Sequence, residues 1–300
     1  MISAFPYFCL SLAMILVGSS VAAGEVLIRH FPVHLGSLLR FGLAAVLVVP
    51  VWLLREGRPP KLPARVWAIL ATQTLCGSVL FNIFVLNGLR WTSPAAAGII
   101  TSTTPACMGL LAWLLLGERP GGRAVLGICL SVAGVAILNL AGTREGSGES
   151  WMGNLFVVAA VVVEALFLLV RKSIREPLSA LAVSSYVTLL ATAFFLPLGL
   201  PQALDFDFAA LPAEAWGCVL YFAAVVTILA YLCWFAGVTR VQAGVAGIFT
   251  GILPLSALLV SAMFLGQPVT QEHLFGCGLA ISSIVLICSG KTLPSARAET

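Results

Sequence analysis

Ten long apolar runs, separated by short charged or Pro/Gly-rich breaks, follow one another along the chain. Each is close to the length of about 20 residues that a helix needs to cross a bilayer. Stretches such as Ala44 to Leu54 and Val157 to Val163 are apolar on every face, whereas the strands of a membrane β-barrel alternate apolar and polar positions. The pattern predicts an all-α integral membrane protein with ten transmembrane helices, near residues 5–24, 33–54, 66–89, 93–116, 122–141, 152–170, 178–199, 214–237, 242–265 and 273–290.

Composition supports a membrane protein and excludes several other classes. Hydrophobic residues make up 60% of the chain and charged residues only 9%, against the ~25% charged residues of a soluble domain. The net charge is +4, and no run of five or six like charges offers a surface for nucleic acid. The eight cysteines lie in apolar runs without metal-binding spacing, so we read them as small buried side chains and expect no metal and no cofactor.

The distribution of basic residues predicts the orientation of the chain. Twelve Lys and Arg fall on one side if the N-terminus is cytoplasmic, and three fall on the other. Because cytoplasmic loops are enriched in basic residues, both termini are expected in the cytoplasm of a bacterial-type inner membrane. The twelve are Arg55, Arg58, Lys61, Arg65, Arg119, Arg123, Arg171, Lys172, Arg175, Arg240, Lys291 and Arg297; the three are Arg29, Arg90 and Arg144.

The two halves of the sequence are related by an internal repeat. A shift of 149 residues, without a gap, pairs Trp67 with Trp216, Gly88 with Gly237, Ala97-Gly98 with Ala246-Gly247, Thr101 with Thr250, Pro105 with Pro254 and Gly127 with Gly276. Five spans in each half mean that the second half enters the membrane in the opposite sense, which is typical of secondary transporters. We therefore expect a first five-helix repeat at 1–142, an extracytoplasmic linker at 143–151, a second repeat at 152–291 and a cytoplasmic tail at 292–300.

Several motifs of the first half carry a family resemblance. Thr92-Ser93-Pro94-Ala95-Ala96-Ala97-Gly98, then Thr104-Pro105, then Leu111-Ala112-Trp113-Leu114-Leu115-Leu116-Gly117-Glu118-Arg119, resemble the EamA branch of the drug/metabolite transporter superfamily. The second half repeats the pattern more loosely, with Gln267 where the family often has Glu. The resemblance covers essentially the whole chain. It implies a ten-helix inner-membrane carrier, commonly an exporter of amino acids or other small metabolites.

Two ionisable residues lie inside predicted spans. Glu164 follows three valines in the sixth span, and Arg40 lies between leucines and Phe41 in the second. A charge at this depth costs about 2.5–3.5 kcal/mol on insertion scales, so both side chains should face the bundle interior or a water-filled cavity. Glu164 is a candidate for binding a substrate amine or a proton, or for a structural bond. Arg40 is a candidate for a substrate carboxylate, for helix carbonyls, or for a pair with Glu164.

The remaining site candidates come from prolines, hydroxyls and aromatic residues in the spans. Pro105 and Pro254 lie near the middle of the fourth and ninth spans, where each removes a backbone hydrogen bond and is expected to act as a hinge, or else only to pack. Charged residues at the end of the first span, Glu25, Arg29 and His30, are expected to reach water. The predicted lining of a substrate cavity is Ser78, Asn82, Thr101, Ser102, Glu164, Tyr231, Trp234 and Thr250.

Three function classes remain to be weighed. An intramembrane enzyme is disfavoured because the chain has no HExxH, GxSxG or nucleotide-binding P-loop motif. The scarcity of charge inside the spans favours export of small amphipathic metabolites, most of all amino acids, over the alternative of a multidrug or cation-proton antiporter. The expected partners are a small-molecule substrate, the lipid bilayer and, for a coupled mechanism, protons.

Overall fold

Helices make up the regular structure of the chain. The computed structural model describes residues 5–57, 62–116, 121–144, 150–171, 178–238, 240, 249 and 251–289. Within these ranges there is no strand, so the all-α class is confirmed for the described residues. The elements are α1 (Phe5–His30), α2 (Val33–Glu56), α3 (Ala64–Thr74), η1 (Leu75–Leu80), α4 (Phe81–Gly88), α5 (Pro94–Thr101), α6 (Thr104–Leu116), α7 (Gly122–Arg144), α8 (Trp151–Arg171), α9 (Ala180–Leu204), α10 (Ala213–Leu220), η2 (Tyr221–Leu229), α11 (Ala230–Val238), α13 (Ile252–Leu265) and α14 (Gln271–Ser289).

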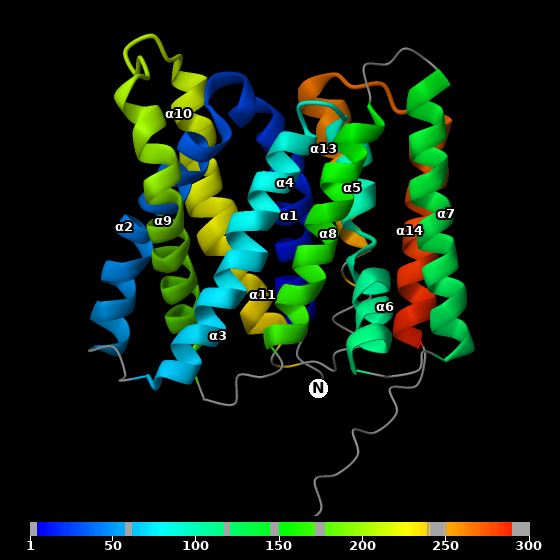
Figure 1. Cartoon of the computed structure of the whole chain (residues 1–300), viewed down its shortest axis with the longest axis horizontal. Coiled ribbons are helices and arrows are strands. Elements are labelled where there is room, and N and C mark those ends of the chain that lie inside the picture. Colours follow the sequence, from blue (N-terminus) through cyan, green and yellow to red (C-terminus); the bar gives the residue numbers. More distant parts are fainter. Residues whose placement is uncertain are drawn as a thin grey trace, which may run out of the picture.

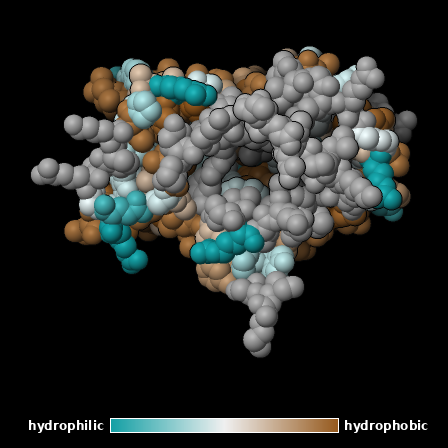
Figure 2. Space-filling model, turned by 90° about the horizontal axis from the view of Figure 1, so that it is seen from below, coloured by the Kyte–Doolittle hydropathy of each residue, from teal (hydrophilic) through white to brown (hydrophobic). Residues whose placement is uncertain are grey.

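The surface of the bundle is suited to lipid. Five helical stretches of the described part are long and apolar enough to cross a membrane, namely 5–30, 33–56, 64–88, 180–204 and 213–234. Large hydrophobic side chains such as Leu54, Met263 and Phe264 are more than three-quarters exposed. Viewed from the side where α1 begins, the coloured residues along the edge of the molecule are mostly hydrophobic (Figure 2). Such a surface is stable in a bilayer and would aggregate in water.

The helices stand side by side and run alternately up and down (Figure 1). α1 begins on the lower side of this view and α14 ends on the same side, while α7 ends and α8 begins on the upper side. α1 therefore rises from the lower side, whereas α8, which opens the second half of the sequence, descends from the upper side.

Packing between the halves is reciprocal. α1 packs against α11 and α13, and α8 packs in the corresponding way against α4, α5 and α6. α2 pairs with α9, and α7 pairs with α14. Two glycines at equivalent positions of the repeat permit the close contacts. A methyl group at Gly88 would lie 2.8 Å from Val157 of α8, and one at Gly237 would lie 2.7 Å from Leu10 of α1.

Two spans that the sequence predicts as plain helices contain π-helical stretches. In the first half, the Phe81 N–H donates to the Cys76 carbonyl, five residues back, in η1. In the second half, the Ala230 N–H donates to the Val225 carbonyl in η2. The stretches overlap when the sequence is shifted by 149 residues. π-helical turns are rare and occur frequently at functional sites.

The fourth span is interrupted instead of kinked. α5 ends at Thr101, and α6 begins at Thr104 with Pro105 in its first turn. α13 likewise begins at Ile252 with Pro254 in its first turn. Proline is well accommodated there because the N–H groups of a first helical turn have no partner within the helix. Each proline thus lies in the first turn of a helix, and a hinge role for either residue stays a prediction.

Candidate functional site

A buried arginine lies at the centre of one polar cluster. Arg40 of α2 has only 6% of its surface exposed. Its guanidinium carbon lies 4.5 Å from the ring centre of Phe41 and 4.6 Å from that of Phe222 in η2. Contact with aromatic faces stabilises a desolvated cation by about 2 kcal/mol. The two rings thus hold the guanidinium between the first and the second half of the chain.

Asn82 of α4 fixes the orientation of this arginine. Arg40 Nη1 donates to Asn82 Oδ1 at 2.9 Å, and Asn82 Nδ2 donates to the Ser78 carbonyl at 2.7 Å. All three residues are buried. The amide is therefore used at both ends, because its oxygen faces the cation and its nitrogen is held by the helix one turn earlier.

The equivalent span of the second half also lies against Arg40, through Phe222. Thr227 of η2 is 1% exposed, and Tyr231 of α11 lies close enough to Arg40 to interact with it electrostatically. Tyr231 and Trp234 pack against Val183 and Val187 of α9. The predicted residues Ser78, Asn82, Tyr231 and Trp234 thus lie on spans that pack around α2 and α9.

Glu164 belongs to a second cluster, in which it contacts the interrupted fourth span. The Thr104 hydroxyl lies 2.6 Å from Glu164 Oε2 and 2.8 Å from the Thr101 carbonyl oxygen. A hydroxyl has one proton to donate. Both contacts are satisfied when the carboxyl carries a proton and donates to Thr104, which then donates to Thr101. An ionised carboxylate would instead accept the hydrogen bond from the Thr104 hydroxyl, and the Thr101 carbonyl would then lose its hydrogen bond from that hydroxyl.

The interruption itself is lined by hydroxyls that bond back to the chain. Thr101, Ser102 and Thr103 donate to the carbonyls of Gly98, Ile99 and Ile100, each three residues earlier. These bonds give the buried hydroxyls partners at the end of α5, where the Gly98 and Ile100 carbonyls also accept from the backbone N–H groups of Ser102 and Thr103. Thr101 and Ser102 were predicted to line the cavity; the structure places both, buried, at this helix end.

The two predicted intramembrane charges have separate partners. Arg40 bonds to Asn82, whereas Glu164 bonds to Thr104, and the described residues contain no ion pair between them. Thr250, the remaining predicted lining residue, lies outside the described residues. The candidate site therefore consists of an arginine cluster on α2, α4 and η2 and a carboxyl cluster on α6 and α8.

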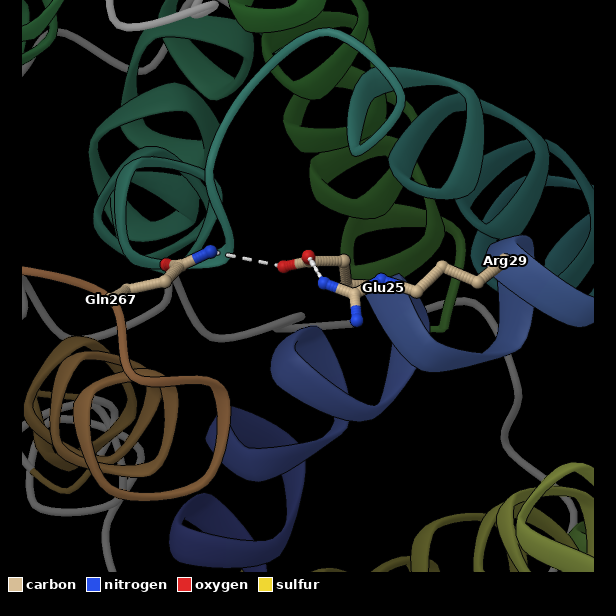
Figure 3. A network of polar contacts seen from close by, with 3 residues as sticks. All are labelled: Glu25, Arg29 and Gln267. Atoms are coloured by element: carbon tan, nitrogen blue, oxygen red, sulfur yellow. Dashed lines mark hydrogen bonds and ion pairs between the residues drawn. The ribbon is translucent and has the colours of Figure 1, made fainter.

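A third polar contact joins the ends of two helices and was not predicted. Gln267, which follows α13, donates from Nε2 to Glu25 Oε2 at 3.0 Å, and Arg29 pairs with the other oxygen of Glu25 (Figure 3). Figure 3 shows Glu25 between its two partners, reaching from α1 toward the segment after α13. From the sequence, Glu25 and Arg29 were expected to reach water, with no partner predicted for either. No sequence pattern links Glu25 to Gln267, which lies 242 residues further along the chain, so this bond could not be predicted.

Other buried polar groups had no sequence signal. Gln73 of α3 is 1% exposed and neither its amide oxygen nor its nitrogen has a hydrogen-bond partner among the described residues. The Ser184 and Ser185 hydroxyls of α9 are also without partners there. A cavity of about 430 Å³ between α2, α9 and α10 is lined almost entirely by apolar groups, among them Leu39, Leu196 and Val219.

Comparison with known proteins gives consistent results across the whole chain. The profile of the EamA-like transporter family matches residues 4–140 and, a second time, residues 151–289. "Uncharacterized transporter YetK" of Bacillus subtilis is 39% identical over 292 residues, which covers 97% of this chain and 88% of that protein. A "Probable terminal-alkyne amino-acid exporter" of Streptantibioticus cattleyicolor is 27% identical and covers 71% of both chains.

A solved crystal structure has the same fold. It matches with a TM-score of 0.66 at 21% identity and covers 96% of this chain and 99% of its own. At this level of identity the likeness extends to the arrangement of the helices alone.

Proposed function

Because this chain belongs to the EamA-like transporter family, we propose that it is a secondary transporter that exports small amphipathic metabolites, chiefly amino acids with apolar or aromatic side chains. The family match over both halves supports transport, and the amino-acid exporter of Streptantibioticus cattleyicolor supports the substrate class. The observation that carries the proposal is the arginine cluster. It gathers a few polar groups inside an otherwise apolar bundle, as a site for an amphipathic solute requires.

The proposed mechanism is alternating access between two inverted five-helix repeats, residues 1–142 and 152–291, joined by an extracytoplasmic linker at 143–151. Ten spanning helices would result. The opposite directions of α1 and α8 and the reciprocal packing of the two halves support this arrangement. A substrate site between the repeats is common in such carriers. Arg40 meets this condition because it is held by Asn82 of one repeat and Phe222 of the other.

We place the protein in a bacterial-type inner membrane with both termini in the cytoplasm. The excess of basic residues on one side supports this orientation. A fluorescent-protein fusion after Thr300 should be bright and an alkaline-phosphatase fusion inactive. The reverse result would invert the orientation.

Export of cations in exchange for protons is the second candidate function. It is favoured by the bond between Thr104 and Glu164, which places an exchangeable proton beside the interrupted fourth span. In this mechanism the carboxyl would release its proton as a cationic substrate enters. The sequence contains no P-loop, so in either case transport would run downhill or use an ion gradient.

Counterflow in proteoliposomes distinguishes the two functions. Purified protein would be reconstituted with a high internal concentration of one unlabelled compound, and uptake of its labelled form would be followed, for a panel of amino acids and for cationic dyes. We expect counterflow of apolar and aromatic amino acids. Counterflow of the dyes alone, dependent on a pH gradient, would favour the antiporter and contradict our proposal.

A further inference from the structure

The guanidinium of Arg40 has no negative partner within the part of the chain that the structure describes. Among the described residues, no carboxylate lies within ion-pair distance of it; the ion pair found there joins Arg29 to Glu25. Its Nε also has no hydrogen-bond partner within those residues. A buried charge left unpaired costs several kcal/mol. The protein maintains this cost at a position where two aromatic rings and an amide hold the cation in one orientation.

Two hydroxyls on the spans that hold this cation are also unused. The Ser78 hydroxyl belongs to the residue whose carbonyl holds Asn82, and the Thr227 hydroxyl lies on η2 between Phe222 and Tyr231, both of which are close to Arg40. Both hydroxyls are almost completely buried and have no partner among the described residues. A buried polar group without a partner costs about 1–3 kcal/mol. Each of the three groups would be stabilised by a ligand that supplies an acceptor.

We propose that Arg40, with the hydroxyls of Ser78 and Thr227, forms a binding site for the carboxylate of the substrate. This inference rests on the proposed function and narrows it to solutes that carry a carboxylate. A guanidinium binds a carboxylate through two parallel N–H···O bonds, and these charge-assisted bonds are about twice as strong as neutral ones. The free Nε–H of Arg40 supplies one donor, and Asn82 keeps the planar group from turning.

The charge balance favours a single negative charge. One guanidinium neutralises one carboxylate, and none of the partners found for Arg40 is a second cation. A phosphate with two charges would remain undercompensated between the rings of Phe41 and Phe222. Both rings also favour an apolar body next to the carboxylate, which an apolar or aromatic amino acid has.

The site is tested with one ligand that keeps both charged groups, one that lacks the carboxylate and one that lacks the amine. L-phenylalanine, its C-terminal amide and 3-phenylpropionate would each be added to the purified protein in detergent, and thermal stability and counterflow would be measured. We expect L-phenylalanine and 3-phenylpropionate to stabilise the protein, whereas the amide, which has no negative charge, should bind at least 10-fold more weakly.

Variants connect this selectivity to the residues. Arg40→Gln should weaken binding of L-phenylalanine by about 10- to 100-fold and abolish the preference over the amide. Arg240→Gln is a matched control that also removes one positive charge, since Arg240 also stacks on an aromatic ring, that of Phe5, but is exposed at a helix end. If Arg40→Gln fails to fold, Thr227→Val and Ser78→Ala each remove one hydroxyl and should each weaken binding about 3- to 10-fold.

The outcomes separate this inference from the function on which it rests. If the parent protein carries L-phenylalanine and its amide equally well, or if Arg40→Gln keeps the preference for the acid, the carboxylate site is refuted while amino-acid export stands. If the parent carries cationic dyes and neither the amino acid nor 3-phenylpropionate, the proposed function itself has failed.

Discussion

The third and the eighth span share a backbone irregularity and differ in their side chains. Each contains a π-helical stretch, and each approaches a helix of the other half through a glycine, Gly88 in one and Gly237 in the other. At matching positions the side chains differ, with Gln73 opposite Phe222 and Asn82 opposite Tyr231 in the repeat. One span therefore offers Arg40 an amide and the other offers it an aromatic ring. The irregular backbone has been kept in both copies, while the side chains have specialised to hold one cation from two directions.

The largest test of this division replaces the aromatic ring. Phe222→Ala removes a buried ring that contacts Arg40 and should lower the free energy of unfolding by about 3–5 kcal/mol. Gln73→Leu changes the matching position of the first half and should have an effect of about 1 kcal/mol or less, because the lost amide has no bonded partner to leave behind. Unfolding in detergent micelles measures both. Equal losses of unfolding free energy in the two variants would mean that Phe222 and Gln73 contribute equally to stability, against the proposed difference between the halves.

The amide of the first half is tested by a change of similar size. Asn82→Leu removes the oxygen that accepts from Arg40 and should cost about 1.5–3 kcal/mol, because the lost bond involves a charged group. Tyr231→Phe, at the matching position, keeps the ring and should cost less than about 1 kcal/mol. Thermal stability with and without L-phenylalanine reports both changes. A larger loss from Tyr231→Phe would contradict the assignment of Asn82 as the residue that positions Arg40.

Gly88 and Gly237 test a feature that the two halves share, so substitutions at both positions should have similar effects on stability. Gly88→Ala and Gly237→Ala each place a methyl group against the neighbouring helix and should each cost about 1–3 kcal/mol. Gly217→Ala in α10 is the control, because a methyl group there meets nothing within 4 Å and favours the helix. If only one of the two buried glycines is sensitive, the close packing of the halves is not equivalent.

The smallest expected effect concerns Glu164. Glu164→Gln keeps the shape of the side chain, and the amide can still donate to Thr104, so amino-acid counterflow should remain within a few-fold of that of the parent. In a cation-proton antiporter the same change would abolish transport driven by a pH gradient. If a folded Glu164→Gln variant transports none of the amino acids that the parent carries, the expectation that amino-acid transport does not need the Glu164 carboxyl is wrong.

The sequence was informative where the signal is local. The apolar runs gave the positions of the helices, whereas Pro105 and Pro254, expected near the middle of two spans, lie in the first turns of α6 and α13. The π-helical stretches were missed because no composition or spacing distinguishes them from an ordinary apolar helix. The partners of Arg40 and Glu164 lie 42 and 60 residues away along the chain, so they depend on how helices pack. Phe222, which reads as one apolar residue among many, became recognisable as part of the site only beside Arg40.

The chemistry of the bond between Gln267 and Glu25 determines how this contact depends on pH. An amide N–H remains a donor whatever the pH of the medium, so Gln267 can donate to Glu25 without either side chain having to share a proton. A second glutamate in its place would have to keep a proton to make the same bond, and two ionised carboxylates would repel each other. Because Gln267 carries a nitrogen in place of that oxygen, the contact between α1 and the segment after α13 does not depend on such a proton.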